Sequence, residues 1–151
     1  MALHPKFPKS PYVILDPATR WFPADETLRD QGYEKLLPPL VAELRKKVRD
    51  WRASDYESVS DTSRALLKWW FLTEHPVEGK DGETFLFQYY FAQREAVETV
   101  IWLYEVAKAH DKYELMKFDT SGYLRTGQFD ETWTRYVIKM ATGSGKTKVL
   151  S

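Results

Sequence analysis

The sequence predicts an α/β chain in which a mainly helical amino-terminal region leads into one strand and a glycine-bearing loop. Two observations support this prediction. Apolar residues recur at helical spacing between residues 38 and 108, and an apolar run at 135–140 is followed at once by a loop at 141–147. We divide the 151 residues into an extended Pro-rich arm (1–37), a helical region (38–84), and a region from 85 to 151 that contains the strand and the loop.

Composition limits the classes of protein that remain open. Hydrophobic residues make up 43% of the chain, which allows a packed core, while the basic and acidic residues, 22 of each, give zero net charge. Bulk charge therefore does not indicate nucleic-acid binding, although a local basic groove remains compatible with it. The lack of Cys excludes disulfides and thiolate zinc sites, and His4, His75 and His110 lack ligand-like spacing. No leader or membrane-spanning segment is apparent, so we expect a cytoplasmic protein without membrane partners.

The amino-terminal arm holds five of the eight Pro residues within residues 1–30. We expect this arm to be extended and to pack on the body of the protein. Residues 12–15 could form an edge strand, and Trp21 to Pro23 an aromatic anchor.

A first helix is predicted from Pro38 or Pro39, because Pro is tolerated in the first helical turn. Its apolar residues recur at helical spacing, namely Leu40, Val41, Leu44, Val48 and Trp51. The opposite side of the helix is basic, with Arg45, Lys46, Lys47, Arg49 and Arg52. A basic face could bind DNA phosphates. We favour a solvated face, because Glu43 and Asp50 partly neutralise it.

A second helix is predicted to begin at a cap formed by Ser60 or Asp61 and to end before His75. Trp69 and Trp70 lie within it. Such a pair could stack on bases in a single-strand channel, but burial against the preceding helix is the favoured interpretation. Residues 79–82 form a turn-rich connection.

A third, longer helix is predicted from about Gln88 to Lys108, with apolar positions at Tyr90, Val97, Ile101, Tyr104 and Ala107. Gln93 lies near its start. Taken alone, Gln93 is a polar residue on an amphipathic helix.

The loop at 141–147 has the layout of a phosphate-binding P-loop, namely strand, glycines, Gly-Lys-Thr and helix start. Gly143 and Gly145 allow the tight turn that lets backbone N–H groups converge on a phosphate. Lys146 would supply charge at the β- and γ-phosphates and is the candidate catalytic residue, and the Thr147 hydroxyl would ligate Mg²⁺. The candidate nucleotide-binding residues of the loop are Thr142, Gly143, Ser144, Gly145, Lys146 and Thr147.

One position departs from the general P-loop pattern. Met140 stands where Gly or Ala is common, five residues before Gly145. The alternative is a Gly/Ser-rich turn that happens to precede Lys-Thr. We favour the P-loop, because an apolar strand is predicted where the motif needs one.

Residues 140–147, MATGSGKT, closely resemble motif I of superfamily 2 (DEAD/DEAH-box) helicases, in the branch of the Res subunits of type III restriction enzymes. Residues 91–100, FAQREAVETV, resemble the adenine-recognition (Q) motif of the same superfamily. With PPLVAELRKK and LLKWWF, the resemblance covers Pro38 to Ser151. It implies a RecA-like ATPase domain that binds ATP and Mg²⁺, with Gln93 pairing with the adenine edge and Phe91 or an aromatic neighbour stacking on it.

The resemblance also implies a function. We expect the leading segment of an ATP-dependent DNA translocase or helicase of a restriction (phage-defence) system, with a methyltransferase or specificity subunit as a partner. DNA contacts and any nuclease domain would lie mostly beyond Ser151, so the chain alone should bind ATP weakly and not hydrolyse it. Gln93 and Lys146 lie 53 positions apart, which predicts an inserted loop or small hairpin at 110–133. The alternatives are a non-catalytic helical interaction module with a vestigial P-loop and, less favoured, a P-loop kinase.

Overall fold

The computed structural model describes residues 10–17, 39–122, 124 and 133–150. Its elements in chain order are α2 (Val41–Ala53), α3 (Asp61–Leu72), β1 (His75–Glu78), β2 (Thr84–Phe87), α4 (Phe91–Ile101), the π-helical turn η2 (Trp102–Val106), α5 (Lys112–Met116) and α6 (Lys146–Leu150). Helices predominate, and the described residues form one two-stranded sheet, so the predicted mixture of helix and strand is confirmed at this coarse level. No helix among the described residues is long and apolar enough to cross a membrane.

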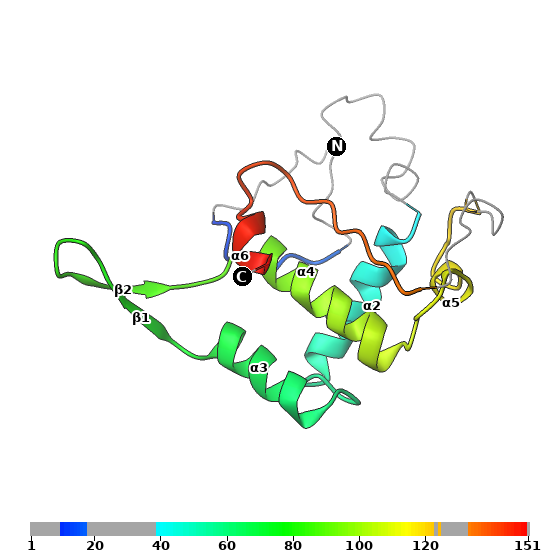
Figure 1. Cartoon of the computed structure of the whole chain (residues 1–151), viewed down its shortest axis with the longest axis horizontal. Coiled ribbons are helices and arrows are strands. Elements are labelled where there is room, and N and C mark those ends of the chain that lie inside the picture. Colours follow the sequence, from blue (N-terminus) through cyan, green and yellow to red (C-terminus); the bar gives the residue numbers. More distant parts are fainter. Residues whose placement is uncertain (1–9, 18–38, 123, 125–132, 151) are drawn as a thin grey trace, which may run out of the picture.

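The core lies where α2 meets α4 and η2 (Figure 1). Leu44, Val48 and Trp51 of α2 are buried, as their helical spacing predicted. Each such side chain contributes about 1.5–3 kcal/mol when it is fully buried. The cluster is completed by residues from the loop after α2, from α3, from η2 and from the connection after η2, namely Tyr56, Val59, Leu67, Trp102, Leu103 and Ala109. The helix α2 begins at Val41, two residues after Pro39, whereas the sequence predicted a start at Pro38 or Pro39.

The basic side of α2 is paired with carboxylates. Arg49 contacts Asp50 and Asp16, and Lys47 contacts Glu43 one turn away. For Arg49 and Lys47 these pairs agree with the favoured interpretation of a neutralised, solvated face. Arg52 is different, because its side chain is turned inward to the buried carboxylate of Glu98. The pair between Arg49 and Asp16 also shows that the described part of the amino-terminal arm contacts the body.

A buried carboxylate joins α4 to α2. Glu98 is fully buried, and its Oε2 accepts a hydrogen bond from Arg52 Nε at 2.9 Å. Its Oε1 accepts hydrogen bonds from Arg94 Nε at 2.8 Å and from the Tyr56 hydroxyl at 2.6 Å. Burial, together with the neighbouring charge of Glu98, raises the pKa of Tyr56, so this hydroxyl stays a neutral donor. A buried charge is tolerated only with partners of this kind.

Replacing Glu98 with Gln should therefore destabilise the protein severely. Glu98→Gln leaves Arg52 and Arg94 without their anion, and breaking a buried ion pair in this way costs about 3–5 kcal/mol. Urea unfolding would measure the change, with Glu57→Gln as the matched control on an exposed side chain. Equal stability of the two variants would contradict a dependence of the core on this carboxylate.

The start of α3 is fixed by a cap and by a carboxylate from η2. The Ser60 hydroxyl accepts a hydrogen bond from the Ser63 N–H at 3.3 Å, which confirms the predicted cap. Glu105 accepts hydrogen bonds from the Ser60 N–H at 2.8 Å and from the Ser63 hydroxyl. The hydrogen bond from Ser63, followed by that from Ser60, lowers the pKa of Glu105.

This lowered pKa makes stability depend on pH in a defined direction. A carboxyl whose folded-state pKa is depressed contributes stability above its unfolded value, near 4.3 for Glu, and loses it as the pH falls through the folded value. Wild type should therefore lose more stability than Glu105→Gln between neutral and acidic pH, as measured by urea unfolding across that range. Glu57→Gln should follow wild type. Parallel profiles for wild type and Glu105→Gln would contradict the assigned hydrogen bonds.

The predicted burial of the tryptophan pair is wrong for Trp69. Its side chain is 54% exposed and contacts the His75 ring edge to face at 4.8 Å, whereas Trp70 is half-buried. Leu67 is the one buried residue of α3, because the described elements cover one side of this helix. Helical spacing identifies an apolar face but not whether a neighbour covers it.

The strands β1 and β2 form an antiparallel hairpin that projects from the helical body (Figure 1). His75 pairs with Phe87 and Glu78 with Thr84. The predicted turn at 79–82 is confirmed, with Gly82 in the left-handed region at a φ of 76°. These two strands are not among the elements predicted from the sequence.

The predicted helix from Gln88 to Lys108 is correct in place but not in form. It begins at Phe91, because the Gln93 side chain accepts a hydrogen bond from the Tyr90 N–H and marks the helix start. It then widens into η2, where the Ala107 N–H donates to the Trp102 carbonyl, five residues back. The wider turn shifts the side chains that follow, so Trp102 and Leu103 are buried and Tyr104 is 53% exposed.

Two predicted strands are absent from the described residues. Residues 135–140 are extended but pair with no neighbouring strand, and Val137 is 88% exposed. Residues 12–15 form no strand either. A strand needs a partner for its backbone groups, and local composition cannot supply one. The region 110–133 contains the helix α5 in its described part, while residues 125–132, like Trp21 to Pro23, lie outside the described residues.

Candidate functional site: the glycine loop and the start of α4

The loop at 141–147 turns in the way that its glycines predicted. The Ser144 N–H donates to the Ala141 carbonyl at 3.3 Å, and the Ser144 hydroxyl donates to the same oxygen at 2.6 Å. Gly143 and Gly145 both lie in the left-handed region, with φ of 80° and 76°. Residues with a Cβ rarely adopt this conformation, so the two glycines are what allows the turn.

Gln93 connects this loop to the start of α4. Its Nε2 donates a hydrogen bond to the Gly145 carbonyl at 3.0 Å, and its Oε1 accepts from the Tyr90 N–H at 2.8 Å. The side chain is 5% exposed. Two candidate elements that lie far apart in the sequence are thereby in direct contact. Because both ends of the amide are engaged, contact with an adenine edge would require Gln93 to exchange a protein partner for the base.

The loop lies closest to the Gln93 side chain at Gly145. A Cβ at this position would lie 2.3 Å from Gln93 Nε2, whereas a Cβ at Gly143 would meet nothing within 4 Å. Gly145→Ala should therefore displace Gln93, and Gly143→Ala should impose similar backbone strain, about 1–2 kcal/mol, without displacing it. The side-chain amide signals of Gln93 in an ¹H–¹⁵N spectrum would report the difference. Unchanged Gln93 signals in Gly145→Ala would contradict the contact.

The remaining loop residues are exposed. Lys146 Nζ donates to the carbonyls of Met140 and Ala141 at 3.2 and 3.3 Å, so the amine lies over the loop. Thr142 and Thr147 are exposed as well. Within the described residues, no acceptor is paired with the N–H groups of Gly145, Lys146 and Thr147. Unpaired N–H groups beside an ammonium group are the donor set that a phosphate requires.

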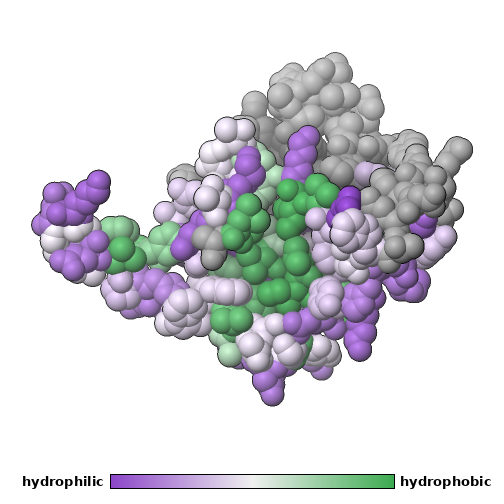
Figure 2. Space-filling view, in the orientation of Figure 1, coloured by the Kyte–Doolittle hydropathy of each residue, from purple (hydrophilic) through white to green (hydrophobic). Residues whose placement is uncertain are grey.

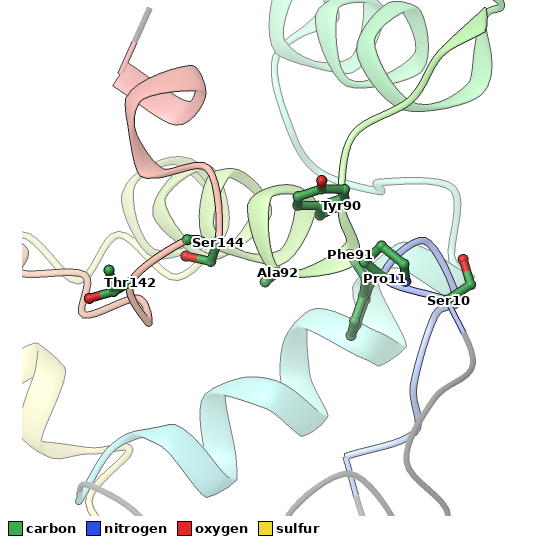
Figure 3. Close-up of a pocket in the computed structure, with 8 residues that line it drawn as sticks. Ser10, Pro11, Tyr90, Phe91, Ala92, Thr142 and Ser144 are labelled. Atoms are coloured by element: carbon green, nitrogen blue, oxygen red, sulfur yellow. The ribbon is translucent and has the colours of Figure 1, made fainter.

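An open cleft of about 470 Å³ lies beside the loop (Figure 3). Its walls come from three segments of the chain: Thr142, Gly143 and Ser144 of the loop, Tyr90, Phe91 and Ala92 at the start of α4, and Ser10 and Pro11 of the arm. The Phe91 N–H donates to the Pro11 carbonyl at 2.8 Å, which fixes the arm on α4. Lys146 and Thr147 are not among the residues that line the cleft.

The aromatic residues at this cleft differ in how far they can reach a ligand. Phe91 is 6% exposed, and Arg52 lies over its ring at 5.3 Å, so much of the ring is already covered. Tyr90 is half-buried, and its ring lies 5.4 Å from that of Tyr12. Of the two aromatic residues at the start of α4, Tyr90 is therefore the more accessible stacking group.

A metal ion would find few protein ligands here. Among the described residues, no group of three or more acidic or His side chains is placed to hold a metal ion. Thr147 would contribute a single hydroxyl. Any Mg²⁺ at this loop would therefore depend mainly on phosphate oxygens and water.

Two parts of this region are not predicted from the sequence. The arm is expected to pack on the body, but nothing local marks Ser10 and Pro11 as the wall of a cleft. Glu98 is not singled out either, although Arg94 and Glu98 lie four residues apart and such a pair is a recognisable helical ion pair.

No protein-family model, curated protein or solved structure matches this chain.

Proposed function

We propose that this chain binds ATP at the loop 141–147 and belongs to an ATP-dependent DNA translocase or helicase of a restriction (phage-defence) system, with a RecA-like ATPase domain. The resemblance of MATGSGKT and FAQREAVETV to superfamily 2 motifs suggests this function. The contact between Gln93 and Gly145 is the observation that carries it, because it joins the residues of both motifs in one site.

Each loop residue has a defined part in this proposal. The N–H groups of the loop would bind phosphate oxygens, and Lys146 would leave the Met140 and Ala141 carbonyls to neutralise the terminal phosphates. Thr147 would hold Mg²⁺, which supplies further neutralisation when bound. Gln93 would read the adenine edge, and Tyr90, which lines the cleft beside the loop, would stack on its face.

Nucleotide binding by this chain should be weak and should depend on Lys146. We expect MgATP to shift the backbone amide signals of Gly143 and Gly145 in ¹H–¹⁵N spectra, without hydrolysis. Lys146→Ala should weaken binding about 10-fold or more, because a hydrogen bond to a charged group contributes about 1.5–3 kcal/mol. Lys139→Ala, which removes an exposed charge just before the loop, is the matched control. Equal affinity of wild type and Lys146→Ala would contradict the proposal.

One observation favours a second candidate function, a non-catalytic interaction module. Val77, Phe85 and Leu86 of the hairpin and Leu72 at the end of α3 are at least 40% exposed. Figure 2 shows this apolar stem of the hairpin leading to a polar tip, away from the body. An isolated two-stranded hairpin is marginally stable by itself, so a partner could stabilise it. If MgATP does not shift the amide signals of Gly143 and Gly145, the interaction module becomes the favoured function.

A further inference from the structure

The hydrogen-bonding pattern of the hairpin follows from its turn. The Gly79 N–H donates to the Glu83 carbonyl at 2.8 Å, so these two residues form a hydrogen-bonded pair next to the turn. Hydrogen-bonded and non-hydrogen-bonded pairs alternate along an antiparallel ladder. The next pair, Glu78 with Thr84, is therefore a non-hydrogen-bonded pair, and so is the pair two positions further from the turn.

The two outer edges of the hairpin differ in what they offer to a further strand. Residues of non-hydrogen-bonded pairs direct their N–H and C=O groups outward, away from the partner strand. On β1 these residues are Pro76 and Glu78, and Pro76 has no N–H group. On β2 they are Thr84 and Leu86, whose N–H groups have no acceptor within the described part of the chain. The edge of β1 is therefore interrupted, whereas the edge of β2 is open.

Apolar side chains lie on both faces of the hairpin beside this open edge. Residues opposite each other in the register share a face, so Val77 and Phe85 lie on one face and Leu86 lies on the other. These three side chains are 40%, 53% and 60% exposed. A hairpin of two strands is marginally stable alone, and a third strand would cover part of this apolar surface.

The hairpin and its flanks are acidic. Residues 73–90 contain four carboxylates and one Lys, namely Glu74, Glu78, Asp81, Glu83 and Lys80. None of these five side chains has a hydrogen bond or an ion pair with a described residue. Two cations of other elements lie at the base of the hairpin: Arg94 is paired with Glu98, and Lys148 Nζ is 5.5 Å from the Phe87 ring. The projecting part therefore keeps an excess of negative charge, which favours a basic partner and disfavours a second acidic hairpin.

We infer that the outer edge of β2 binds an extended, basic segment of a partner protein as a third strand. The backbone of that segment would pair with the N–H and C=O groups of Thr84 and Leu86. Its Lys or Arg side chains would lie near Glu78 and Glu83, and its apolar side chains would cover Phe85 or Leu86. The inference names the partner of the interaction module, on which it rests, and it shares no residue with the nucleotide loop.

The test adds a peptide of about six residues, the usual length of a strand, in which Lys alternates with Val. ¹H–¹⁵N spectra of the protein are recorded without ATP. The amide signals of Thr84 and Leu86 should shift, and that of Glu78, on the outer edge of β1, should shift less. The same peptide with Glu in place of every Lys is the charge control, and it should bind about 10-fold more weakly or worse.

Two variants separate the backbone from the charge. Thr84→Pro removes an N–H from the open edge, as Pro76 does on the other edge, and should weaken peptide binding about 10-fold or more. Glu78→Gln leaves the backbone unchanged and should weaken binding about 2-fold to 5-fold, as expected for the loss of one exposed charge. Glu57→Gln, on an exposed side chain outside the hairpin, is the matched control and should bind like wild type.

Several outcomes would overturn the third strand. These are no shift of the edge amides at about 1 mM peptide, equal affinity for the Lys and Glu peptides, or binding like wild type by both Thr84→Pro and Glu78→Gln. Shifts of Thr84 and Leu86 that grow with protein concentration alone would identify a second copy as the occupant and would also overturn it.

Failure of this inference can be told apart from failure of the proposed functions. A peptide that shifts the side-chain signals of Val77 and Phe85, but not the amides of the β2 edge, would overturn the third strand and leave the interaction module in place. Because ATP is absent from the experiment, MgATP binding at the loop remains a separate result.

Discussion

The carboxylate of Glu98 is surrounded by Arg52, Arg94 and Tyr56, and the position of α4 against α2 depends on it. Apolar packing between these helices favours contact but tolerates sliding, whereas three donors on one carboxylate fix both the register and the rotation of α4. Tyr56 reaches this position from a loop in the left-handed region, at a φ of 58°. The surrounding contacts hold this unfavourable backbone, so loop and helix stabilise each other.

The rotation of α4 about its axis determines where Gln93 lies relative to the glycine loop. Gln93 and Arg94 are adjacent, yet Arg94 points to the buried carboxylate and Gln93 to the Gly145 carbonyl. The loop is thus attached, through one helix turn, to the most constrained part of the core. A substitution at Glu98 would therefore change the position of the loop, although the two are not in direct contact.

Features that depend on the spacing of residues close together in the sequence were predicted correctly. Features that depend on contacts between distant parts of the chain were not. The apolar stripe of α2, the cap at Ser60 and the left-handed glycines of the loop all follow from short-range rules. Residues 135–140 have the composition of a buried strand, but among the described residues no strand lies beside them to accept their hydrogen bonds. Trp69 also has helical spacing, but none of the described elements covers it, and its side chain is 54% exposed. The π-helical turn and the pairing of Glu98 with Arg52 arise from tertiary contacts that no periodicity shows.

One short segment, residues 133–140, leads from the body of the protein to the candidate site. The segment leads to the Met140 and Ala141 carbonyls, which accept hydrogen bonds from Lys146 Nζ. Tyr136 attaches the segment near its start, while Val137 and Lys139 are exposed. At the loop, the Lys146 amine and the Gln93 amide both donate hydrogen bonds to protein carbonyls. A nucleotide must replace these hydrogen bonds, so the binding free energy contains only the difference between the new hydrogen bonds and the old ones. That exchange would release the Met140 carbonyl, which lies four residues after Tyr136, where the segment is attached to the body.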